Sequence, residues 1–352
     1  MLWQTRSRGI PREDCPIRLC DTWGQRRVSK GYRDRIEKSR VGSIRNPGIS
    51  DRIQFMVTDM EKTLEKKVAV ITGSGRGIGR AIALRLAQGG AKVVVNDYGV
   101  GPDGSGSAPG LADEVVEEIV KGGGEAVSNG DSVATKEGGD HIIETALEAF
   151  GGIDILVNNA GIVVDRMIFN LTEQDWDLVV KVNLYGHYFC TRPATEIMRR
   201  QRSGRIINFS SGAGLGKTIG CANYAAAKEG VIGFTRAVAR DMSRYGVTCN
   251  AIRPLALTRH FDENRKQAWL RQGKTSEVEE MENSRPEDVA DFVSYLASDE
   301  ADYITGRTFY VGGGRISLYS EPERIASIQR GNTWTDETLR QMVPGLLGRP
   351  GM

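Results

Sequence analysis

The chain has 352 residues, 39% of them hydrophobic, and a formal net charge of +2 at pH 7. This length allows one large α/β domain with tails or two average domains, and the hydrophobic content suffices for a sizeable core. Residues 1–59 carry 13 Lys and Arg against 7 Asp and Glu, whereas the rest of the chain carries 34 against 38. Because the larger part is nearly neutral, the composition disfavours a nucleic-acid partner.

The cysteines are odd in number and scattered, with no spacing that suits a zinc site: Cys15, Cys20, Cys190, Cys221 and Cys249. Reduced thiols in a cytoplasmic protein without a bound metal are the simplest interpretation. No run of about 18 apolar residues occurs, so we expect no membrane span. The first 30 residues also lack the apolar core of a signal peptide.

Residues 1–59 mix Arg, Ser, Gly and Pro with little periodicity. This pattern predicts a disordered N-terminal extension. An Arg-rich organelle-targeting segment is the alternative, although acidic residues weaken it: Glu13, Asp14, Asp21 and Asp34.

From Lys66 onward, apolar runs of strand length alternate with amphipathic stretches of helix length. The strand-like runs are residues 68–72, 92–96, 126–128, 155–158, 205–209, 248–252 and 308–311. The helix-like stretches are residues 79–88, 112–121, 138–150, 174–200, 222–245 and 286–297. The alternation predicts a single-domain α/β fold over residues 60–315, a Rossmann-type doubly wound parallel sheet of about seven strands.

A glycine cluster, Thr72-Gly73-Ser74-Gly75-Arg76-Gly77-Ile78-Gly79, follows the first predicted strand and opens the first predicted helix. Glycines there allow a tight turn and a close approach of the backbone to a pyrophosphate, which would sit on the helix N-terminus. An ordinary glycine-rich turn is the alternative. We expect this segment to bind a dinucleotide through Gly73, Ser74, Arg76, Gly77, Ile78 and Gly79.

Asp97 ends the second strand, 18 residues after Gly79. A carboxylate at this point can accept both ribose hydroxyls of NAD and would repel the 2′-phosphate of NADP. Arg76 favours the opposite choice, because its cation could meet a 2′-phosphate. The sequence predicts NAD, with NADP left open.

Tyr224 and Lys228 stand at i and i+4 and therefore share one helix face. Oxidation of an alcohol by hydride loss needs a base, and a phenol with a pKa of about 10 serves only if a nearby cation lowers that pKa. Ser211 ends a strand 13 residues before Tyr224, where its hydroxyl could steady the reacting oxygen. Ser210 is the competing neighbour, and a strand-end cap is the plainer interpretation of its hydroxyl.

At this point the chain resembles the short-chain dehydrogenases/reductases over about residues 64–314. The matching residues are Thr72 to Gly79, Asn158-Asn159-Ala160-Gly161, Asn183, Ser211, Tyr224 and Lys228. The resemblance implies that Tyr224 is the proton donor and acceptor, that Lys228 lowers its pKa and binds the nicotinamide ribose, and that Ser211 polarises the substrate oxygen. It further implies that Asn183 holds a water that links Lys228 to solvent.

The same resemblance implies further cofactor contacts. Asp131 matches the residue that contacts adenine, with Ser132 beside it. Residues Asn158, Asn159, Ala160 and Gly161 would line the adenosine side and stabilise the sheet, and a purely structural role is the alternative. Thr258 matches a position that touches the nicotinamide amide or the pyrophosphate. The family usually has Pro-Gly where this chain has Pro254-Leu255, which restricts the backbone beside the nicotinamide.

Within the family, the chain is most similar to hydroxyacyl-CoA dehydrogenase and 3-oxoacyl reductase members. We therefore expect an oxidoreductase that interconverts a secondary alcohol and its ketone by hydride transfer. The hypothetical substrate is a 3-hydroxyacyl-CoA or another bulky hydrophobic alcohol, and a steroid or terpenoid alcohol is the alternative. A dinucleotide-binding sensor without catalysis is a further alternative, although all four catalytic positions are present. An epimerase or dehydratase would need a nucleotide-sugar domain, for which the segment after Thr258 is too short.

Two segments are assigned to other roles. Residues 258–284, with Phe261, Trp269 and Leu270, form a candidate substrate lid or a simple packing face. Residues 316–352 form a tail in which Thr335 starts a helix. We expect this tail to pack on a neighbouring subunit, or to be loosely attached. The family resemblance implies a homo-oligomer, a dimer or tetramer, assembled through the helices at 174–200 and 222–245.

Overall fold

The computed structural model describes residues 63–106, 108, 110–257, 266–267, 270–271, 273, 275–329 and 333–347. The expectations for residues 1–59, for Thr258 and for the lid residues Phe261 and Trp269 fall outside these described residues.

The described residues form one sheet of eight strands in the order β3-β2-β1-β4-β5-β6-β7-β8. Their bounds are β1 Val68–Thr72, β2 Lys92–Asn96, β3 Glu125–Asn129, β4 Ile155–Asn158, β5 Gly204–Phe209, β6 Val247–Pro254, β7 Thr308–Gly312 and β8 Arg315–Leu318. The first seven are parallel and match the seven predicted strands. The eighth pairs antiparallel with β7 and was not predicted.

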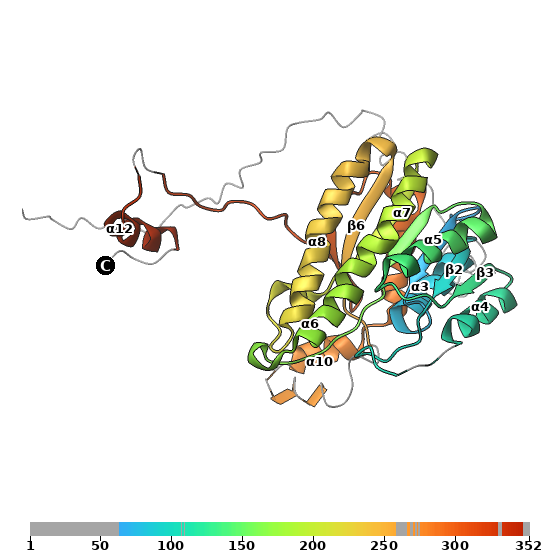
Figure 1. Cartoon of the computed structure of the whole chain (residues 1–352), viewed down its shortest axis with the longest axis horizontal. Coiled ribbons are helices and arrows are strands. Elements are labelled where there is room, and N and C mark those ends of the chain that lie inside the picture. Colours follow the sequence, from blue (N-terminus) through green and yellow to red (C-terminus); the bar gives the residue numbers. More distant parts are fainter. Residues whose placement is uncertain are drawn as a thin grey trace, which may run out of the picture. The chain divides into compact units, whose positions relative to one another are not determined.

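The helices cover both faces of this sheet (Figure 1). Those that follow the first three strands are α3 Gly77–Gln88, α4 Leu111–Lys121 and α5 Lys136–Phe150. The others are α6 Glu173–Val180, α7 Gly186–Gln201, α8 Ala222–Met242, α10 Thr275–Glu282 and α11 Pro286–Ala297. A last helix, α12 Asp336–Leu346, lies in the C-terminal tail. The side chain of Thr335 caps α12, which confirms the predicted start of that helix.

Residues 174–200, predicted as a single helix, contain a π-helical turn. This turn, η2 (Lys181–Tyr185), separates α6 from α7. A π-turn inserts one extra residue into the helical ladder and often occurs at functional positions. The turn contains Asn183, one of the predicted site residues.

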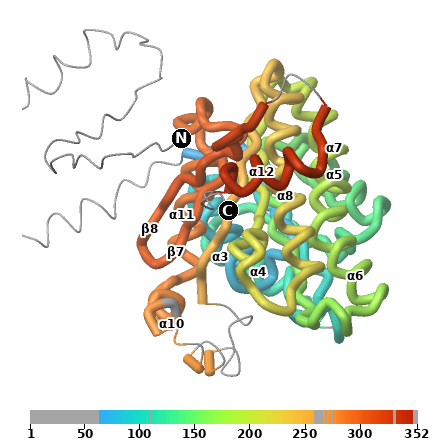
Figure 2. Tube along the Cα trace, turned by 90° about the vertical axis from the view of Figure 1, so that its left-hand side faces the viewer, coloured from blue at the N-terminus to red at the C-terminus, as the bar shows by residue number. Residues whose placement is uncertain are grey.

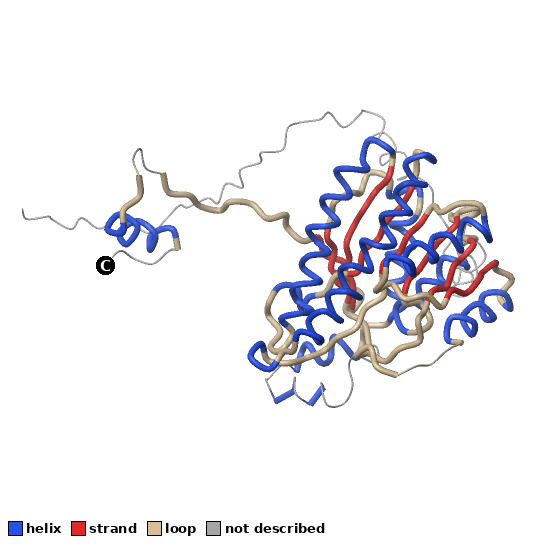
Figure 3. The backbone as a smooth tube through the Cα atoms, in the orientation of Figure 1, coloured by secondary structure: helices blue, strands red, loops and turns tan. Residues whose placement is uncertain are grey.

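Two hydrophobic cores lie on opposite faces of the sheet because successive strand residues point to opposite sides. In β1, Ala69 and Ile71 belong to the core shared with α3, α4 and α11. Val68 and Val70 belong to the core shared with α5, α7 and α8. Figure 2 shows α11 on the other side of the sheet from α5 and α7, and Figure 3 shows the strands between the helical layers.

The strand order reverses at β1, which pairs with β2 on one side and with β4 on the other. In open parallel sheets, ligands bind at the carboxyl ends of the strands beside this switch point. The glycine cluster follows β1, and residues 159–161 follow β4. The fold therefore brings the predicted motifs to one edge of the sheet. Among the described residues, no helix is long and apolar enough to cross a bilayer.

Candidate active site

The glycine loop after β1 is packed so closely that side chains would not fit at several positions. Gly73 has φ +65°, and a Cβ added there would lie 2.7 Å from Ala160 Cα. A Cβ at Gly79 would lie 2.2 Å from the carbonyl oxygen of Gly73. Gly77, at φ +54°, opens α3, whose N-terminus receives no side-chain capping bond. The loop thus presents unpaired helical N–H groups, a suitable site for a phosphate.

Residues from the end of β4 hold this loop in place. The Asn159 side chain donates to the carbonyl oxygens of Thr72 (3.0 Å) and Gly73 (2.9 Å). The backbone N–H groups of Asn159 and Ala160 both donate to Thr72 Oγ1 at 3.1 Å. The Ser74 hydroxyl is fully buried and donates to Ile71 O at 2.8 Å. The side chains of Ser74 and Asn159 are thus bonded within the protein and shape the loop.

Asp97 lies beside the loop with its carboxylate fixed by two backbone groups. Gly75 N donates to Oδ2 (2.9 Å) and Gly99 N donates to Oδ1 (2.8 Å). Each carboxylate oxygen has further lone pairs, so both can still accept a ribose hydroxyl. Arg76 donates to the carbonyl oxygen of Val100 at 3.2 Å, and its Nε is buried without a partner among the described residues.

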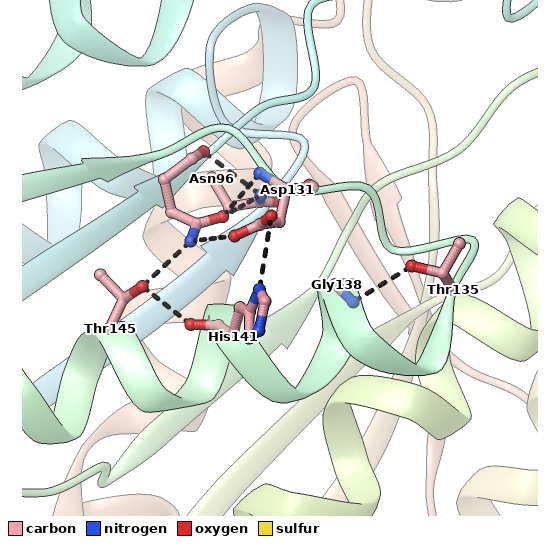
Figure 4. Close-up of polar contacts among 7 residues, drawn as sticks. Asn96, Asp131, Thr135, Gly138, His141 and Thr145 are labelled. Atoms are coloured by element: carbon pink, nitrogen blue, oxygen red, sulfur yellow. Dashed lines mark hydrogen bonds and ion pairs between the residues drawn. The ribbon is translucent and has the colours of Figure 1, made fainter.

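A polar network at the ends of β2 and β3 holds Asp131 (Figure 4). The Asn129 side chain donates to Asp131 Oδ2 and accepts from Asp131 N, both at 2.9 Å. Asn96 Nδ2 donates to the Asp131 carbonyl oxygen at 2.9 Å, and His141 Nδ1 lies 3.7 Å from Asp131 Oδ1. This network fixes Asp131 on the same sheet edge as Asp97. Ser132, beside it, accepts at Oγ from Ala134 N at 3.2 Å.

Asn158 lies deeper than the other residues of its motif. Its side chain is buried inside the sheet and donates to Thr191 Oγ1 (3.0 Å) and Asn208 Oδ1 (2.9 Å). These bonds join β4 to β5 and α7. The contacts of Asn158 therefore fit a purely structural role. Asn159, Ala160 and Gly161 instead lie beside the glycine loop.

The helix α8 begins at the site and carries Tyr224 and Lys228. The buried Asn223 side chain donates to the carbonyl oxygens of Val164 and Asp175, both at 3.3 Å, and so fixes the start of the helix. Lys228 Nζ donates to the Phe209 carbonyl oxygen at 2.8 Å and lies 5.7 Å from the centroid of the Tyr224 ring. The structure thus brings the predicted phenol and ammonium together.

Lys228 is almost completely buried, and this burial lowers its pKa to about 7. A lysine with such a pKa can release and regain a proton near neutral pH.

Asn183 approaches Lys228 from the π-turn. Its Nδ2 donates to the carbonyl oxygens of Ile162 (2.8 Å) and Val179 (3.0 Å). Its Oδ1 is buried without a partner among the described residues. A Cβ added at Gly161 would lie 2.7 Å from that oxygen and 3.4 Å from Lys228 Nζ. Only glycine therefore leaves room for a small polar molecule between the two groups.

The two serines after β5 make different contacts. The Ser210 hydroxyl is buried and donates to the Lys228 carbonyl oxygen at 2.7 Å. Ser211 Oγ accepts from Ala213 N at 3.2 Å, so the hydroxyl keeps its proton to donate to a substrate oxygen. Of the two, Ser211 has the hydroxyl suited to a ligand.

His187 is a neighbour of the site that the sequence did not single out. It lies in α7, is buried, and its Nε2 has no partner among the described residues. Burial, and then the charge of Lys228, hold the pKa of His187 well below its usual value. Its position on the buried face of α7, with Cys190 and Thr191, is the signal that could have indicated it.

The Pro254-Leu255 departure has a structural counterpart at the end of β6. Leu255 N donates to Val311 O at 2.8 Å. Leu255 packs on Gly312, where an added Cβ would lie 2.6 Å from the Leu255 Cβ. A glycine on β7 thus accommodates the leucine. Pro254 is half-buried at the strand end.

The groups at this sheet edge fit a dinucleotide. The N-terminus of α3 can receive a pyrophosphate over a loop in which a Cβ at Gly73, Gly75 or Gly79 would clash. Asp97 offers two fixed carboxylate oxygens to a ribose. Beyond them lie a phenol, a buried lysine and a hydroxyl, which are groups for moving a proton at a carbinol.

Comparison with known proteins agrees with this arrangement. A family model described as enoyl-(acyl carrier protein) reductase matches residues 73–315. The chain is 42% identical to a 3-oxoacyl-[acyl-carrier-protein] reductase of Synechocystis sp. over 254 residues, which is 72% of this chain and 98% of that protein. It is 41% identical to the peroxisomal hydratase-dehydrogenase-epimerase of Neurospora crassa over 251 residues, which is 71% of this chain and 26% of that protein.

The crystal structure of a short chain dehydrogenase from Mycobacterium avium superposes with a TM-score of 0.70 at 43% identity. The match covers 82% of this chain and 98% of that one. The sequence, the sheet order and the geometry of the strand ends lead to the same assignment. The chain belongs to the short-chain dehydrogenase/reductase family, oxidoreductases that interconvert an alcohol and a ketone with a nicotinamide dinucleotide.

Proposed function

We propose that the chain is an NAD-dependent 3-hydroxyacyl-CoA dehydrogenase whose proton-transfer group is Tyr224, assisted by Ser211, Lys228 and Asn183. The observation that carries the proposal is the placement of Lys228 Nζ, which lies 5.7 Å from the centroid of the Tyr224 ring and is held by the carbonyl oxygen of Phe209. The acyl part rests on the names of the relatives, which act on 3-oxoacyl groups or include a dehydrogenase step.

A nicotinamide dinucleotide, when bound, accepts the hydride from the carbinol carbon or returns it to the ketone. Tyr224 accepts the hydroxyl proton of the alcohol during oxidation and donates it back during reduction. Ser211 donates a hydrogen bond to the same oxygen and stabilises the charge that develops there. Lys228 favours the phenolate by its positive charge.

A proton held by Tyr224 has to reach solvent after each turnover. Lys228, with a pKa of about 7, can pass this proton at neutral pH. We propose that Asn183 Oδ1 holds a water beside Lys228 Nζ, in the space that Gly161 leaves. The unsatisfied buried Oδ1 supports this step, since ordered water usually satisfies such groups.

The cofactor is assigned to NAD on the position of Asp97. Its fixed carboxylate would accept the ribose hydroxyls and would face the 2′-phosphate of NADP with a like charge. Residues Gly73, Ser74, Arg76, Gly77, Ile78 and Gly79 would form the pyrophosphate loop. The remaining contacts would come from Asp131, Ser132, Asn159, Ala160, Gly161, Pro254 and Thr258, with Asn158 supporting them from inside the sheet.

We also propose a homo-oligomer, a dimer or tetramer, that buries the outer faces of α7 and α8. Tyr185 and Tyr188 are 50% and 46% exposed on either side of Phe189, which makes an aromatic surface typical of interfaces. Light scattering coupled to gel filtration would test this assembly, and a monomeric mass would contradict it. The buried thiols Cys190 and Cys249 support a reducing compartment such as the cytoplasm.

The experiment uses the purified full chain with NAD⁺ or NADP⁺ and 3-hydroxyacyl-CoA thioesters of graded chain length. Reduction of the cofactor, followed at 340 nm, is the readout, with steroid and terpenoid alcohols in a parallel panel. We expect turnover of the thioesters with NAD⁺. Turnover of the other alcohols without any turnover of a thioester would reject the substrate class and keep the reaction.

A further inference from the structure

A buried arginine lies directly behind the proposed catalytic serine. Arg253, near the end of β6, has a side chain that is only 4% exposed. A buried guanidinium is costly unless hydrogen bonds and an opposite charge compensate for its lost hydration. Arg253 Nη1 donates to the carbonyl oxygen of Ser211 at 3.1 Å, and Nη2 donates to Glu229 Oε2 at 2.7 Å.

Both partners adjoin groups of the proposed site, because Glu229 is the residue after Lys228. The turn that follows Ser211 rests on the Arg253–Glu229 pair. Gly214 N donates to the same Ser211 carbonyl oxygen at 3.1 Å. A Cβ added at Gly214 would lie 3.0 Å from Glu229 Oε2 and 3.4 Å from Arg253 Nη1. The backbone of Ser211 is therefore held by two donors, one of them charged.

Tyr319, in the segment after β8, also contacts the guanidinium of Arg253. The Arg253 guanidinium carbon lies 5.0 Å from the centroid of the Tyr319 ring. Tyr319 N donates to the Thr308 carbonyl oxygen at 2.9 Å, and Glu321 Oε2 pairs with Arg236 Nη1 on α8 at 3.3 Å. A cation over an aromatic face is attracted to the ring, more so where water is excluded. The ring thus adds a further contact that confines the guanidinium.

We infer that Arg253 is a positioning residue for Ser211, and that Tyr319 holds Arg253 in place, so that the C-terminal segment supports the serine of its own chain. The inference rests on the proposed role of Ser211. The guanidinium fixes the Ser211 backbone, and Ala213 N orients its Oγ at 3.2 Å. Loss of Arg253 would free the Ser211 backbone, so the hydroxyl would no longer be held at the substrate oxygen.

The test compares Arg253→Met, Arg253→Lys, Tyr319→Ala and Tyr319→Phe by steady-state kinetics of the full chain and by fluorescence titration with NADH. We expect Arg253→Met to lower kcat by about 30- to 100-fold, the effect of misplacing a reacting group by about 1 Å, with the Kd for NADH unchanged. Arg253→Lys should recover only part of this loss, because one ammonium cannot reproduce the two directed bonds. Tyr319→Ala should lower kcat several-fold, and Tyr319→Phe, which keeps the ring, should restore it.

Arg205 provides the matched control. It is a buried arginine at the opposite end of β5, where it donates to the carbonyl oxygens of Gly204 (3.1 Å) and Ser298 (3.3 Å). Arg205→Met should lower the melting temperature and leave kcat unchanged. An equal loss of kcat in Arg205→Met and Arg253→Met would overturn the inference, because general destabilisation would then explain both.

Ser211→Ala separates this inference from the proposed function. Loss of turnover in Ser211→Ala with full turnover in folded Arg253→Met would overturn the positioning role alone. Full turnover in Ser211→Ala would instead overturn the role of the serine. If Arg253→Met does not fold, the Tyr319 pair decides, and equal kcat values for Tyr319→Ala and the wild type would overturn the link to the C-terminal segment.

Discussion

Asn183 and Lys228 converge over Gly161 from two different helices. A Cβ added at Gly161 would lie 2.7 Å from Asn183 Oδ1 and 3.4 Å from Lys228 Nζ. Both residues are buried, and Asn183 Oδ1 has no partner among the described residues. The position of that Cβ is lined by these polar groups, which suits the water that we propose between them.

Filling this space tests the relay without changing any charged group. Gly161→Ala places a methyl group where the water would lie, and we expect kcat to fall by about 100-fold, the lower end of the range for lost proton-transfer catalysis. The KM for the alcohol should change little. Gly345→Ala in α12, where an added Cβ meets nothing within 4 Å, is the control and should retain the wild-type kcat. A wild-type kcat in Gly161→Ala would argue against the relay.

The two serines after β5 should differ in what their removal costs. Ser211→Ala should lower kcat by about 100-fold or more, as expected when a donor to a developing oxyanion is lost. Ser210→Ala removes a buried hydrogen bond to the Lys228 carbonyl, so the free energy of unfolding should fall by about 0.5–1.5 kcal/mol while kcat changes only a few-fold. Kinetics and urea denaturation of both variants measure the contrast. A large loss of kcat in Ser210→Ala with little loss in Ser211→Ala would make Ser210 the reacting serine.

Asp97 should decide the choice between NAD and NADP. Asp97→Ala removes the ribose acceptor and the repulsion of a 2′-phosphate, so the ratio of kcat/KM for NAD⁺ over NADP⁺ should fall by about 10- to 100-fold, the worth of one or two charge-assisted hydrogen bonds. Asp103→Ala, in the same loop, removes a carboxylate that accepts from Ser105 and should leave the ratio unchanged. If the wild type prefers NADP⁺, the cofactor assignment is wrong.

Burial of Lys228 should appear in the pH dependence of stability. The folded chain releases this proton at a pKa of about 7, whereas the ordinary value is 10.5. Between these pH values the unfolded chain binds more protons, so the free energy of unfolding rises with pH, by on the order of 4 kcal/mol across the window. Below pH 7 both states are protonated, and the full cost of the buried charge remains.

Lys228→Met removes this dependence along with the activity. We expect the melting temperature of Lys228→Met minus that of the wild type to be highest near pH 6. This difference should decrease as the pH rises from 7 to 10. Thermal denaturation of both proteins across this range provides the measurement. A difference in melting temperature that does not change with pH would mean that burial does not lower the pKa of Lys228.

The sequence predicted the parallel sheet well because buried parallel strands are short apolar runs that glycine-rich turns separate. It missed β8, which carries Arg315 and exposed apolar residues at the sheet edge. A signal was present: Gly313 and Gly314 have φ values of +56° and +67° in the turn before β8, and a Gly-Gly pair between two such runs is typical of a hairpin.

Those predicted site residues that the structure describes lie at or behind the carboxyl ends of the strands. Three further features could not be predicted from the sequence pattern. The π-turn around Asn183 leaves no periodic signal, because it shifts the helical register by a single residue. Arg253 and His187 are polar residues in otherwise buried segments, which is informative only once burial is known. The sequence favoured Ser211 over Ser210 as the reacting serine, and the contacts of the two hydroxyls support that hypothesis.

The most direct test of the account is the rate of NADH formation by Tyr224→Phe beside the wild type, with the best alcohol of the panel and saturating NAD⁺. Phenylalanine keeps the ring and removes the hydroxyl, so folding and the Kd for NADH should be unchanged. The account predicts that kcat falls by about 10³-fold or more, within the range for loss of a general base. A Tyr224→Phe enzyme that forms NADH at the wild-type rate would contradict it.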